Sequence, residues 1–251
     1  MSEPLTPRAV LGRIDGWSDA SIENLGGGLT NRTYLVTAGT RRCVLKIDLE
    51  PRVEPFNSRK DEAKIQRNAN EAGLAPAVLY SDRQCYLTEY VDGAVLSPET
   101  LRSHDTLQRL GRALSKLHAL PGSGRTFDAG HAARIYADRI DDANQSEVRK
   151  RIDIIDSVPV TAELCLCHND LVAETIIDTG ELKFLDWEYA CDNDPLFDLA
   201  TLVAHHDLNE TQADALLSAY FGREWRARRP AVARQVAGYK ALLWLWQAAR
   251  E

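Results

Sequence analysis

The chain has 251 residues, of which 44% are hydrophobic, and a formal net charge of −7 at pH 7. This hydrophobic content is sufficient for a real core, in one large domain or in two smaller lobes. The negative charge argues against a nucleic-acid partner or an anionic membrane partner, because the phosphates of either would be repelled.

Targeting signals and cysteine usage indicate the compartment. The N-terminus MSEPLTPRAV has no basic region followed by an apolar core, so we expect no secretory signal. No apolar run approaches the roughly 20 residues that a membrane span requires. The chain has 5 cysteines, an odd number without the spacing of a disulfide scaffold, which is typical of reduced thiols. We therefore predict a cytoplasmic protein.

The first ninety residues are predicted to form a β-rich unit. Short strands are expected at 22–25, 33–36 and 43–47, and a glycine-rich segment, Gly26 to Asn31, separates the first two. Glycines at such a place let backbone N–H groups approach phosphates without obstruction by side chains. Taken alone, this segment is more typical of a plain hairpin.

A helix and a further hairpin should complete this unit. Asn57 or Ser58 is a plausible N-cap for the helix, and Gly73 is a plausible stop. The segments 78–80 and 85–89 would then pair around a polar turn.

The periodicity becomes helical after residue 93. Apolar residues recur at steps of three and four along one predicted helix, at Leu107, Leu110, Leu114 and Leu117. We place the boundary near Tyr90–Gly93. This division predicts one lobe at 1–91 and a second lobe at 92–251.

The most informative stretch is CLCHNDLVAETIIDTGELKFLDWEYACDNDPLFD, residues 165–198. His168-Asn169-Asp170 would place a carboxylate beside a substrate hydroxyl. Asp186 follows an apolar run sixteen residues later, where a carboxylate can hold magnesium on ATP phosphates. A lone H-x-D loop is a weak signal, but LDWEYA and NDPLFDLA at this spacing make it a strong one. We interpret Cys165 and Cys167 as alternate residues of a buried strand rather than as zinc ligands with His168.

These motifs resemble the choline/ethanolamine kinase family, which belongs with the aminoglycoside phosphotransferases and bacterial thiamine kinases. The resemblance runs from about Ile22 to the C-terminus. It implies an α+β, bilobal protein-kinase-like fold, with a small antiparallel-sheet N-lobe and a larger, mostly helical C-lobe. It also implies a kinase that uses ATP and Mg²⁺ to phosphorylate the hydroxyl of a small cationic alcohol of the choline or ethanolamine type.

The resemblance also implies roles for residues of the nucleotide site. Lys46 takes the place of the family's phosphate-binding lysine, and we expect Glu62 as its ion-pair partner because Glu62 shares a helix face with Ile65 and Ala69. Glu89 and Val91 lie in the segment that offers main-chain groups to adenine in relatives. The nucleotide loop itself comprises Gly27, Gly28, Thr30 and Asn31.

The chemistry would depend on residues of the loop His168-Asn169-Asp170 and of the strand end at Asp186. Asp170 is the candidate base, and His168 should tie the loop down rather than contact substrate. Asp186 is the candidate magnesium ligand, and Glu188 could act on the metal through water. Asp198 should anchor the catalytic loop.

The sequence departs from the family pattern at two places. Thr175 stands where the family has an asparagine as second metal ligand, and a threonine hydroxyl can also ligate magnesium. On the acceptor side, His205 replaces the family's acid. Aromatic faces can bind a cation instead; the available aromatic residues are Tyr189, Trp244 and Trp246.

Two alternatives remain open. One is a thiamine kinase, whose bacterial members share the strand end before the metal-binding aspartate. The other is a nucleotide-binding pseudokinase with little turnover, because Thr175 replaces the metal-binding asparagine. We expect no nucleic-acid or membrane partner, and the sequence leaves the oligomeric state open.

Overall fold

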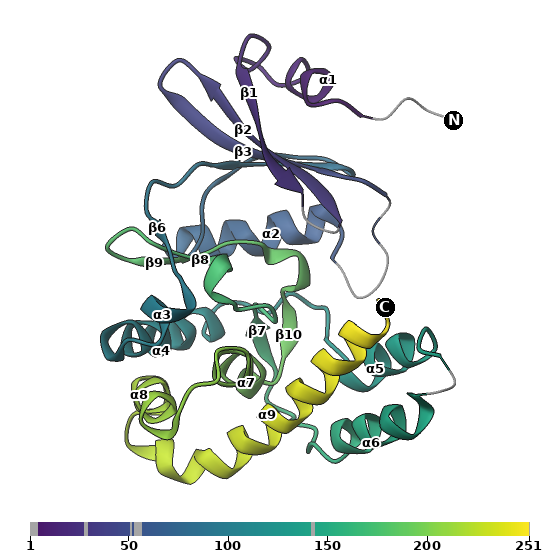
Figure 1. Cartoon of the computed structure of the whole chain (residues 1–251). Helices are drawn as coiled ribbons and strands as arrows, with labels where there is room; N and C mark the ends of the chain where they lie inside the picture. The colour runs from purple at the N-terminus through teal and green to yellow at the C-terminus, as the bar shows by residue number, and fades with distance from the viewer. Residues whose placement is uncertain (1–4, 28–29, 51, 53–56, 142–143, 251) are drawn as a thin grey trace.

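A computed structural model describes residues 5–27, 30–50, 52, 57–141 and 144–250. It has two lobes, a twisted antiparallel sheet with one helix and a larger, mainly helical lobe (Figure 1). This arrangement is the one predicted from the sequence. The division at residues 91 and 92 stays a prediction, and Gly28 lies outside the described residues.

The small lobe contains a five-stranded sheet in the order β1-β2-β3-β5-β4, paired antiparallel throughout. Its strands are β1 (Ser21–Gly27), β2 (Asn31–Ala38), β3 (Arg41–Asp48), β4 (Val78–Ser81) and β5 (Cys85–Glu89). One face of the sheet packs with the short helix α1 (Pro7–Leu11) around a core that includes Leu11, Leu45 and Leu87. Each predicted strand is present and is extended by a few residues at most.

Alternation along β3 places Lys46 on the other face of this sheet. Cys43, Leu45 and Ile47 are buried in the apolar core, so Lys46 points to the opposite side. Its cross-strand partner on β5 is Tyr86, whose hydroxyl donates to Gln66 of the helix α2 (Arg59–Glu71) at 2.8 Å. The Lys46 face is therefore the face that α2 covers.

Helix α2 begins and ends as the sequence indicates. Ser58, rather than Asn57, is the N-cap, and its hydroxyl accepts a hydrogen bond from the Asp61 N–H at 3.2 Å. After the C-terminal residues, Gly73 has a φ of 76°, a left-handed conformation that glycine adopts without strain. Asn57 instead links the lobes, because its backbone N–H donates to the Glu188 carbonyl at 2.8 Å.

Two small sheets lie near α2 in Figure 1 and carry the loops that contain Asp170 and Asp186. Strand β6 (Ala94–Val95) pairs with β8 (Ile176–Asp178), and β8 pairs with β9 (Leu182–Phe184). Strand β7 (Cys165–Cys167) pairs with β10 (Cys191–Asn193). One 3-10 turn, Ala173–Thr175, directly precedes β8, and another, Trp187–Tyr189, follows β9.

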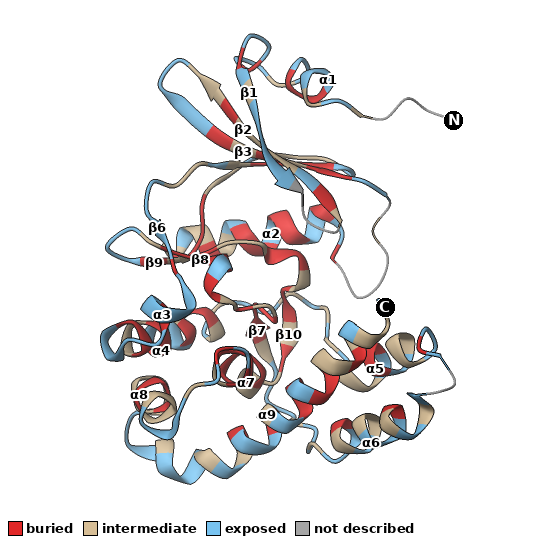
Figure 2. Ribbon diagram, in the orientation of Figure 1, coloured by how far each residue is buried: buried red, intermediate tan, exposed pale blue. Residues whose placement is uncertain are grey.

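The helices of the large lobe surround these sheets. They are α3 (Pro98–Leu101), α4 (His104–His118), α5 (Ala129–Ala137), α6 (Gln145–Asp156), α7 (Pro195–His205), α8 (Glu210–Phe221) and α9 (Trp225–Ala248), with a 3-10 turn at Gly222–Glu224. The predicted leucine stripe of α4 is fully buried, and α7 is buried along most of its length (Figure 2). A Cβ on Gly111 of α4 would lie 2.6 Å from the Leu216 carbonyl oxygen, so glycine allows α8 to approach closely.

The buried residues of α9 do not follow a single stripe. The helix buries Val232, Tyr239, Leu242 and Leu245 and leaves Leu243 and Trp246 half-buried. The reason is that α9 contacts α5, α6, α7 and α8 in turn, so different sides of the helix are covered along its length.

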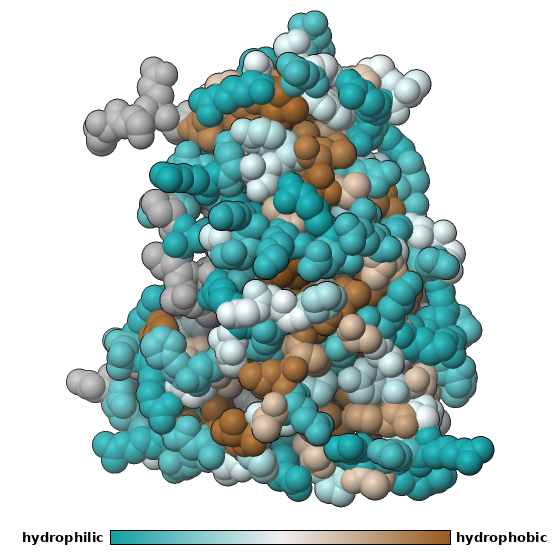
Figure 3. Space-filling model, turned by 180° about the vertical axis from the view of Figure 1, so that it is seen from behind, coloured by the Kyte–Doolittle hydropathy of each residue, from teal (hydrophilic) through white to brown (hydrophobic). Residues whose placement is uncertain are grey.

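The surface carries no extended apolar face on the side seen in Figure 3, where hydrophobic side chains form separate patches among hydrophilic ones. Among the residues that the structure describes, no helix combines the length and the apolar character needed to span a bilayer.

Candidate active site

The catalytic loop after β7 is held by a buried carboxylate of α7. Asp198 accepts hydrogen bonds from the backbone N–H groups of His168 at 2.8 Å and Asn169 at 2.7 Å, and from His118 Nε2 at 3.1 Å. Asn169 has a φ of 66°, a left-handed conformation that asparagine tolerates better than most residues. This geometry agrees with the anchoring role predicted for Asp198.

His168 ties this loop to the strand end that carries the second aspartate. Its Nε2 lies 2.8 Å from the carbonyl oxygen of Leu185, and its ring packs on Trp187 with the centroids 4.8 Å apart. Burial lowers the pKa of His168, so the ring is neutral and donates its proton to that carbonyl. The side chain is therefore placed for positioning rather than for contact with a substrate.

Asp170 is the next residue of the loop and has an unusual electrostatic environment. Among the described residues, no hydrogen bond reaches its carboxylate. Burial and the negative charges of Asp186 and Asp198 raise the pKa of Asp170 from 3.8 to about 7, and Lys46 opposes this rise. A carboxyl with this pKa can accept a proton near neutral pH.

Asp186 follows β9 in a left-handed conformation, with a φ of 63°. Its Oδ1 lies 2.8 Å from Lys46 Nζ, so the pair joins the end of β9 to β3 across the lobes. Burial by itself would raise the pKa of Asp186, but the Lys46 ammonium holds that pKa below its usual value. Asp186 is thus an ionised carboxylate that contacts the Lys46 face of the small lobe.

The expected ion pair between Lys46 and Glu62 is not the one that forms. Glu62 Oε2 lies 2.7 Å from Arg59 Nη1 and 3.3 Å from Arg52 Nη1, whereas Lys46 contacts Asp186. Glu62 is still close enough to raise the pKa of Lys46. Both guanidiniums contact Oε2 of Glu62. Sequence analysis had assigned no role to either arginine.

Asp48 at the end of β3 completes this buried network. Arg59 is fully buried, and its Nη2 lies 2.6 Å from Asp48 Oδ1. Arg52 also lies 3.2 Å from Asp48. Since buried charges are stable only when they are paired, the network explains how Arg59 and Glu62 of α2 can be buried.

Glu188 connects this network to the nucleotide loop. Its Oε2 lies 3.1 Å from Arg52 Nη2 and accepts a hydrogen bond of 3.4 Å from the Thr30 hydroxyl. Burial and the charge of Asp186 raise the pKa of Glu188 to about 7. Asn31, buried at the start of β2, donates to the same hydroxyl at 3.2 Å. Gly27 lies just before, at the end of β1.

The donor set fits a hard divalent cation. Asp170, Asp186 and Glu188 supply carboxylate oxygens, which magnesium prefers. Oxygens Oδ1 of Asp186 and Oε1 of Glu62 are buried and accept no hydrogen bond from the described residues, apart from the ion pair of Asp186 with Lys46. Burial is the largest cause of the raised pKa values of Asp170 and Glu188, and the charge of Asp186 adds to both.

Thr175 is engaged in a different way from the expected metal ligand. Its hydroxyl lies 3.1 Å from the Asp170 carbonyl oxygen and 3.0 Å from that of Val172, and it accepts from the Val172 N–H at 3.2 Å. The hydroxyl therefore closes the turn after Asp170. A bond from this hydroxyl to a metal would compete with those contacts.

The predicted acceptor residues do not form one cluster. His205 is exposed, and its Nδ1 lies 3.3 Å from the hydroxyl of Tyr239. Burial and, to a smaller extent, the charge of Asp170 raise the pKa of Tyr239. Trp244 and Trp246 are both half-buried. Each already faces an arginine, with the Arg151 guanidinium 5.2 Å from the Trp244 ring and the Arg250 guanidinium 4.5 Å from the Trp246 ring.

Two tyrosines lie within range of the charge of the predicted base. The charge of Asp170 contributes to the raised pKa values of Tyr189 and Tyr239, which burial dominates. Tyr189 also interacts with Tyr136 of α5. Tyr189 and Tyr239 therefore lie within range of the charge of Asp170, and sequence analysis had not considered Tyr136 or Tyr239.

Two further predicted residues lie at the end of β5. The Glu89 side chain is exposed, and its backbone N–H donates to the Ala77 carbonyl at 2.8 Å; Val91 is half-buried just beyond. No contact among the described residues joins them to the charged network.

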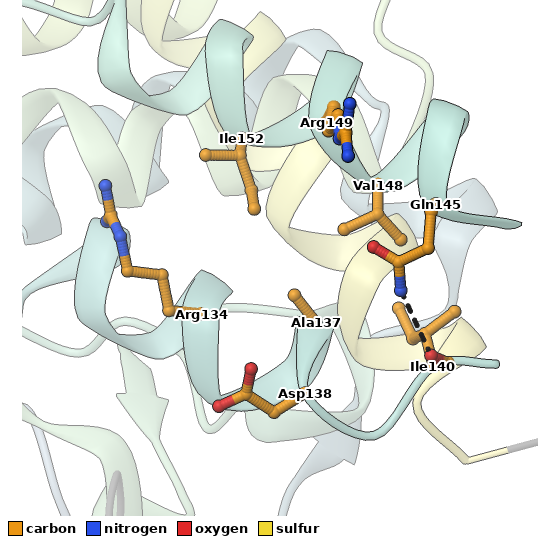
Figure 4. Close-up of a pocket in the computed structure, with 8 residues that line it drawn as sticks. All are labelled: Arg134, Ala137, Asp138, Ile140, Gln145, Val148, Arg149 and Ile152. Carbon is orange, nitrogen blue, oxygen red and sulfur yellow. Dashed lines mark hydrogen bonds between the residues drawn. The ribbon is translucent and has the colours of Figure 1, made fainter. Parts of the chain in front are cut away.

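A pocket lies elsewhere, between α5 and α6, with a volume of about 410 Å³ (Figure 4). It is lined by residues between Arg134 and Ile152, which include the charged Asp138 and Arg149. None of the predicted site residues lines it, so it is not a candidate for the catalytic centre.

The two lobes, with one aspartate after β7 and another after β9, define a protein-kinase-like fold. Residues 21–231 match the model of the phosphotransferase enzyme family (APH), and the chain belongs to this family. It is 30% identical over 207 residues to the protein LicA of Haemophilus influenzae, a match that covers 77% of this chain and 61% of LicA.

Solved structures agree with this assignment. A choline/ethanolamine kinase family protein from Mesorhizobium loti has a TM-score of 0.72 and 30% identity, covering 95% of this chain and 83% of that one. The choline kinase LicA from Streptococcus pneumoniae has a TM-score of 0.77 and 23% identity, covering 92% and 85%. The predicted α+β, bilobal protein-kinase-like fold and the family resemblance are therefore confirmed.

Proposed function

We propose that the protein is an ATP- and magnesium-dependent kinase that transfers the γ-phosphoryl group to the hydroxyl of a small cationic alcohol, of the choline or ethanolamine type. The observation that carries this proposal is the juxtaposition of Asp170, Asp186 and Lys46. The three side chains interact at the junction of the lobes, and Lys46 Nζ lies 2.8 Å from Asp186.

Asp170 acts as the base in this proposal. Its pKa of about 7 lets it orient the acceptor hydroxyl and take up its proton, and the anchoring of the adjacent backbone by Asp198 fixes its position. No part of the reaction requires a covalent enzyme intermediate, because phosphoryl transfer depends on positioning and on charge stabilisation.

Asp186 would hold magnesium, with Glu188 in reach of the same ion or its water. When bound, the metal supplies charge neutralisation on the nucleotide phosphates. Lys46 would then be released toward the phosphates, and Thr30 and Asn31 would line the loop above them. The exposed segment around Glu89 and Val91 is proposed to face adenine, with residues 1–91 as the nucleotide lobe.

The acceptor class is supported by the family and by local chemistry. The relative from Mesorhizobium loti, at 30% identity, is a choline/ethanolamine kinase family protein. In this chain, Tyr189 and Tyr239 lie near the negative charge of Asp170. Aromatic faces beside a carboxylate suit a cationic head group. The free cysteines of the described residues support action in the cytoplasm.

A product assay tests the proposal. Purified protein is incubated with Mg-ATP and each of choline, ethanolamine, thiamine and a neutral sugar, and phosphorylated products are detected by ³¹P NMR. We expect phosphocholine or phosphoethanolamine, and no product with Asp170→Asn. Phosphorylation of thiamine alone would replace the proposed acceptor. Binding of ATP without any product would instead favour the pseudokinase alternative.

A further inference from the structure

The strand that precedes the catalytic loop carries two thiols side by side. Cys165 and Cys167 lie on the same side of β7, and their Sγ atoms are 3.7 Å apart. His118, the last residue of α4, approaches them, so that one ligand atom from each of the three residues lies within 4.8 Å of the others. None of these three side chains has a role in the proposed transfer.

The spacing of the two sulfur atoms matches that of a metal complex. In a tetrahedral site with Zn–S bonds of about 2.3 Å, two sulfur ligands are about 3.8 Å apart. The observed 3.7 Å therefore requires no movement of the strand. Two thiolates and an imidazole form a soft donor set, which selects zinc and related thiophilic cations over magnesium.

The histidine also has the outer partner that a metal-binding histidine usually has. Its Nε2 lies 3.1 Å from the Asp198 carboxylate, and its Nδ1 lies 2.7 Å from the Tyr220 hydroxyl. A carboxylate on one ring nitrogen fixes the ring and leaves the other nitrogen to the metal. Coordination through Nδ1 would exchange only the Tyr220 contact, while Asp198 would stay in place.

We propose that His118, Cys165 and Cys167 form a second cation site, for a thiophilic divalent ion such as Zn²⁺, with water as the fourth ligand. Entry is possible because Cys165 is only half-buried, next to the exposed Leu164. Binding releases the two thiol protons to solvent and transfers no electrons. The site is separate from the magnesium site and does not depend on the proposed kinase activity.

The site has competing hydrogen bonds that limit its affinity. The Cys167 thiol donates to the carbonyl oxygens of Asn193 at 3.7 Å and Asp194 at 3.6 Å. A metal bound to this sulfur would replace those contacts.

Occupancy should be sensed by the catalytic loop. Asp198 bonds both His118 and the backbone of His168 and Asn169. A cation bound to His118 would attract the negative charge of the Asp198 carboxylate. In addition, Cys167 directly precedes His168 in the chain. Two routes, through α7 and along the chain, therefore join the cation site to the loop.

Cobalt absorption tests the site directly. Co²⁺ is titrated into the full chain in a phosphine reductant, and thiolate-to-cobalt charge-transfer absorption is recorded with equilibrium dialysis. We expect one Co²⁺ per chain in this band, displaced by Zn²⁺. Cys165→Ser should weaken binding at least 100-fold, since loss of an outer-shell partner alone costs 10- to 100-fold.

Cys85→Ala is the matched control, because Cys85 is a buried cysteine of the small lobe, outside the cluster. It should retain the band. If Cys165→Ser folds poorly, Cys165→Ala with a circular dichroism check replaces it. Absence of the band in the wild-type protein, or its persistence in both Cys165 variants, would overturn the proposal.

Discussion

Replacing Asp170 with asparagine should stabilise the metal-free protein, and by more at high pH than at low pH. The folded pKa of Asp170 is raised from 3.8 to about 7, so the folded state holds this proton more tightly than the unfolded state does. Stability from this group is fully present below pH 3.8 and is lost as the pH rises through 7. Asparagine has nearly the same shape and never ionises.

The magnitude follows from the pKa difference. Relative to low pH, the raised pKa of Asp170 lowers the free energy of unfolding by at most about 4 kcal/mol at pH 8. At pH 5, where the folded group is still protonated but the unfolded group is ionised, the loss is about 2 kcal/mol. Because no hydrogen bond of the described residues reaches the carboxylate, its replacement removes no contact except attraction to Lys46. We therefore expect Asp170→Asn to gain roughly 2 kcal/mol more at pH 8 than at pH 5.

Urea unfolding at the two pH values, without magnesium or nucleotide, measures this difference by linear extrapolation. Glu174→Gln is the matched control, because Glu174 is an exposed carboxylate of the same loop. A gain for Asp170→Asn that is equal at both pH values, or a loss of stability at pH 8, would refute the electrostatic reasoning.

Three further outcomes are expected. In turnover assays, Asp170→Asn should lower kcat by about 10²- to 10⁴-fold with nearly unchanged ATP affinity, whereas Asp186→Asn should weaken Mg-ATP binding as well; equal effects of both would exchange the assigned roles. Thr175→Val should lose about 1 kcal/mol of stability and slow turnover without shifting the magnesium concentration for half-maximal rate, because the hydroxyl bonds loop carbonyls; a large shift would make Thr175 a metal ligand. Arg59→Met should cost about 3–5 kcal/mol in urea unfolding by leaving Glu62 buried with less compensation, and Arg59→Met/Glu62→Met should recover part of it; additive losses would contradict this pairing.

The sequence predicted the elements and the loops better than it predicted their charged contacts. The strand that carries Lys46 was predicted to within two residues at each end, because period-two burial is a local property. The partner of Lys46 was wrong, since helix periodicity shows only which face Glu62 occupies and cannot show that Arg59, three residues earlier, reaches the same carboxylate. Long, flexible arginine side chains choose partners from the whole fold.

The acceptor side was the least predictable part. Trp244 and Trp246 were named because aromatic faces can bind a cation. Tyr136 and Tyr239 come from two different helices and lie near Tyr189 and Asp170 only after folding. Likewise, His118 joins Cys165 and Cys167 from 47 positions upstream. The adjacent His168 looked like the natural partner but bonds the Leu185 carbonyl instead.

The left-handed backbone at Asp186 places two demands on one position. The φ of 63° favours glycine, with asparagine and aspartate as the next best residues, while the charge that meets Lys46 requires a carboxylate. Glycine would satisfy only the backbone, and glutamate only the charge, with a longer side chain that lacks aspartate's tolerance of this conformation. Aspartate is the single amino acid that serves both demands. Even the replacement of Asp186 by glutamate, usually regarded as the most conservative exchange, would therefore not meet both demands.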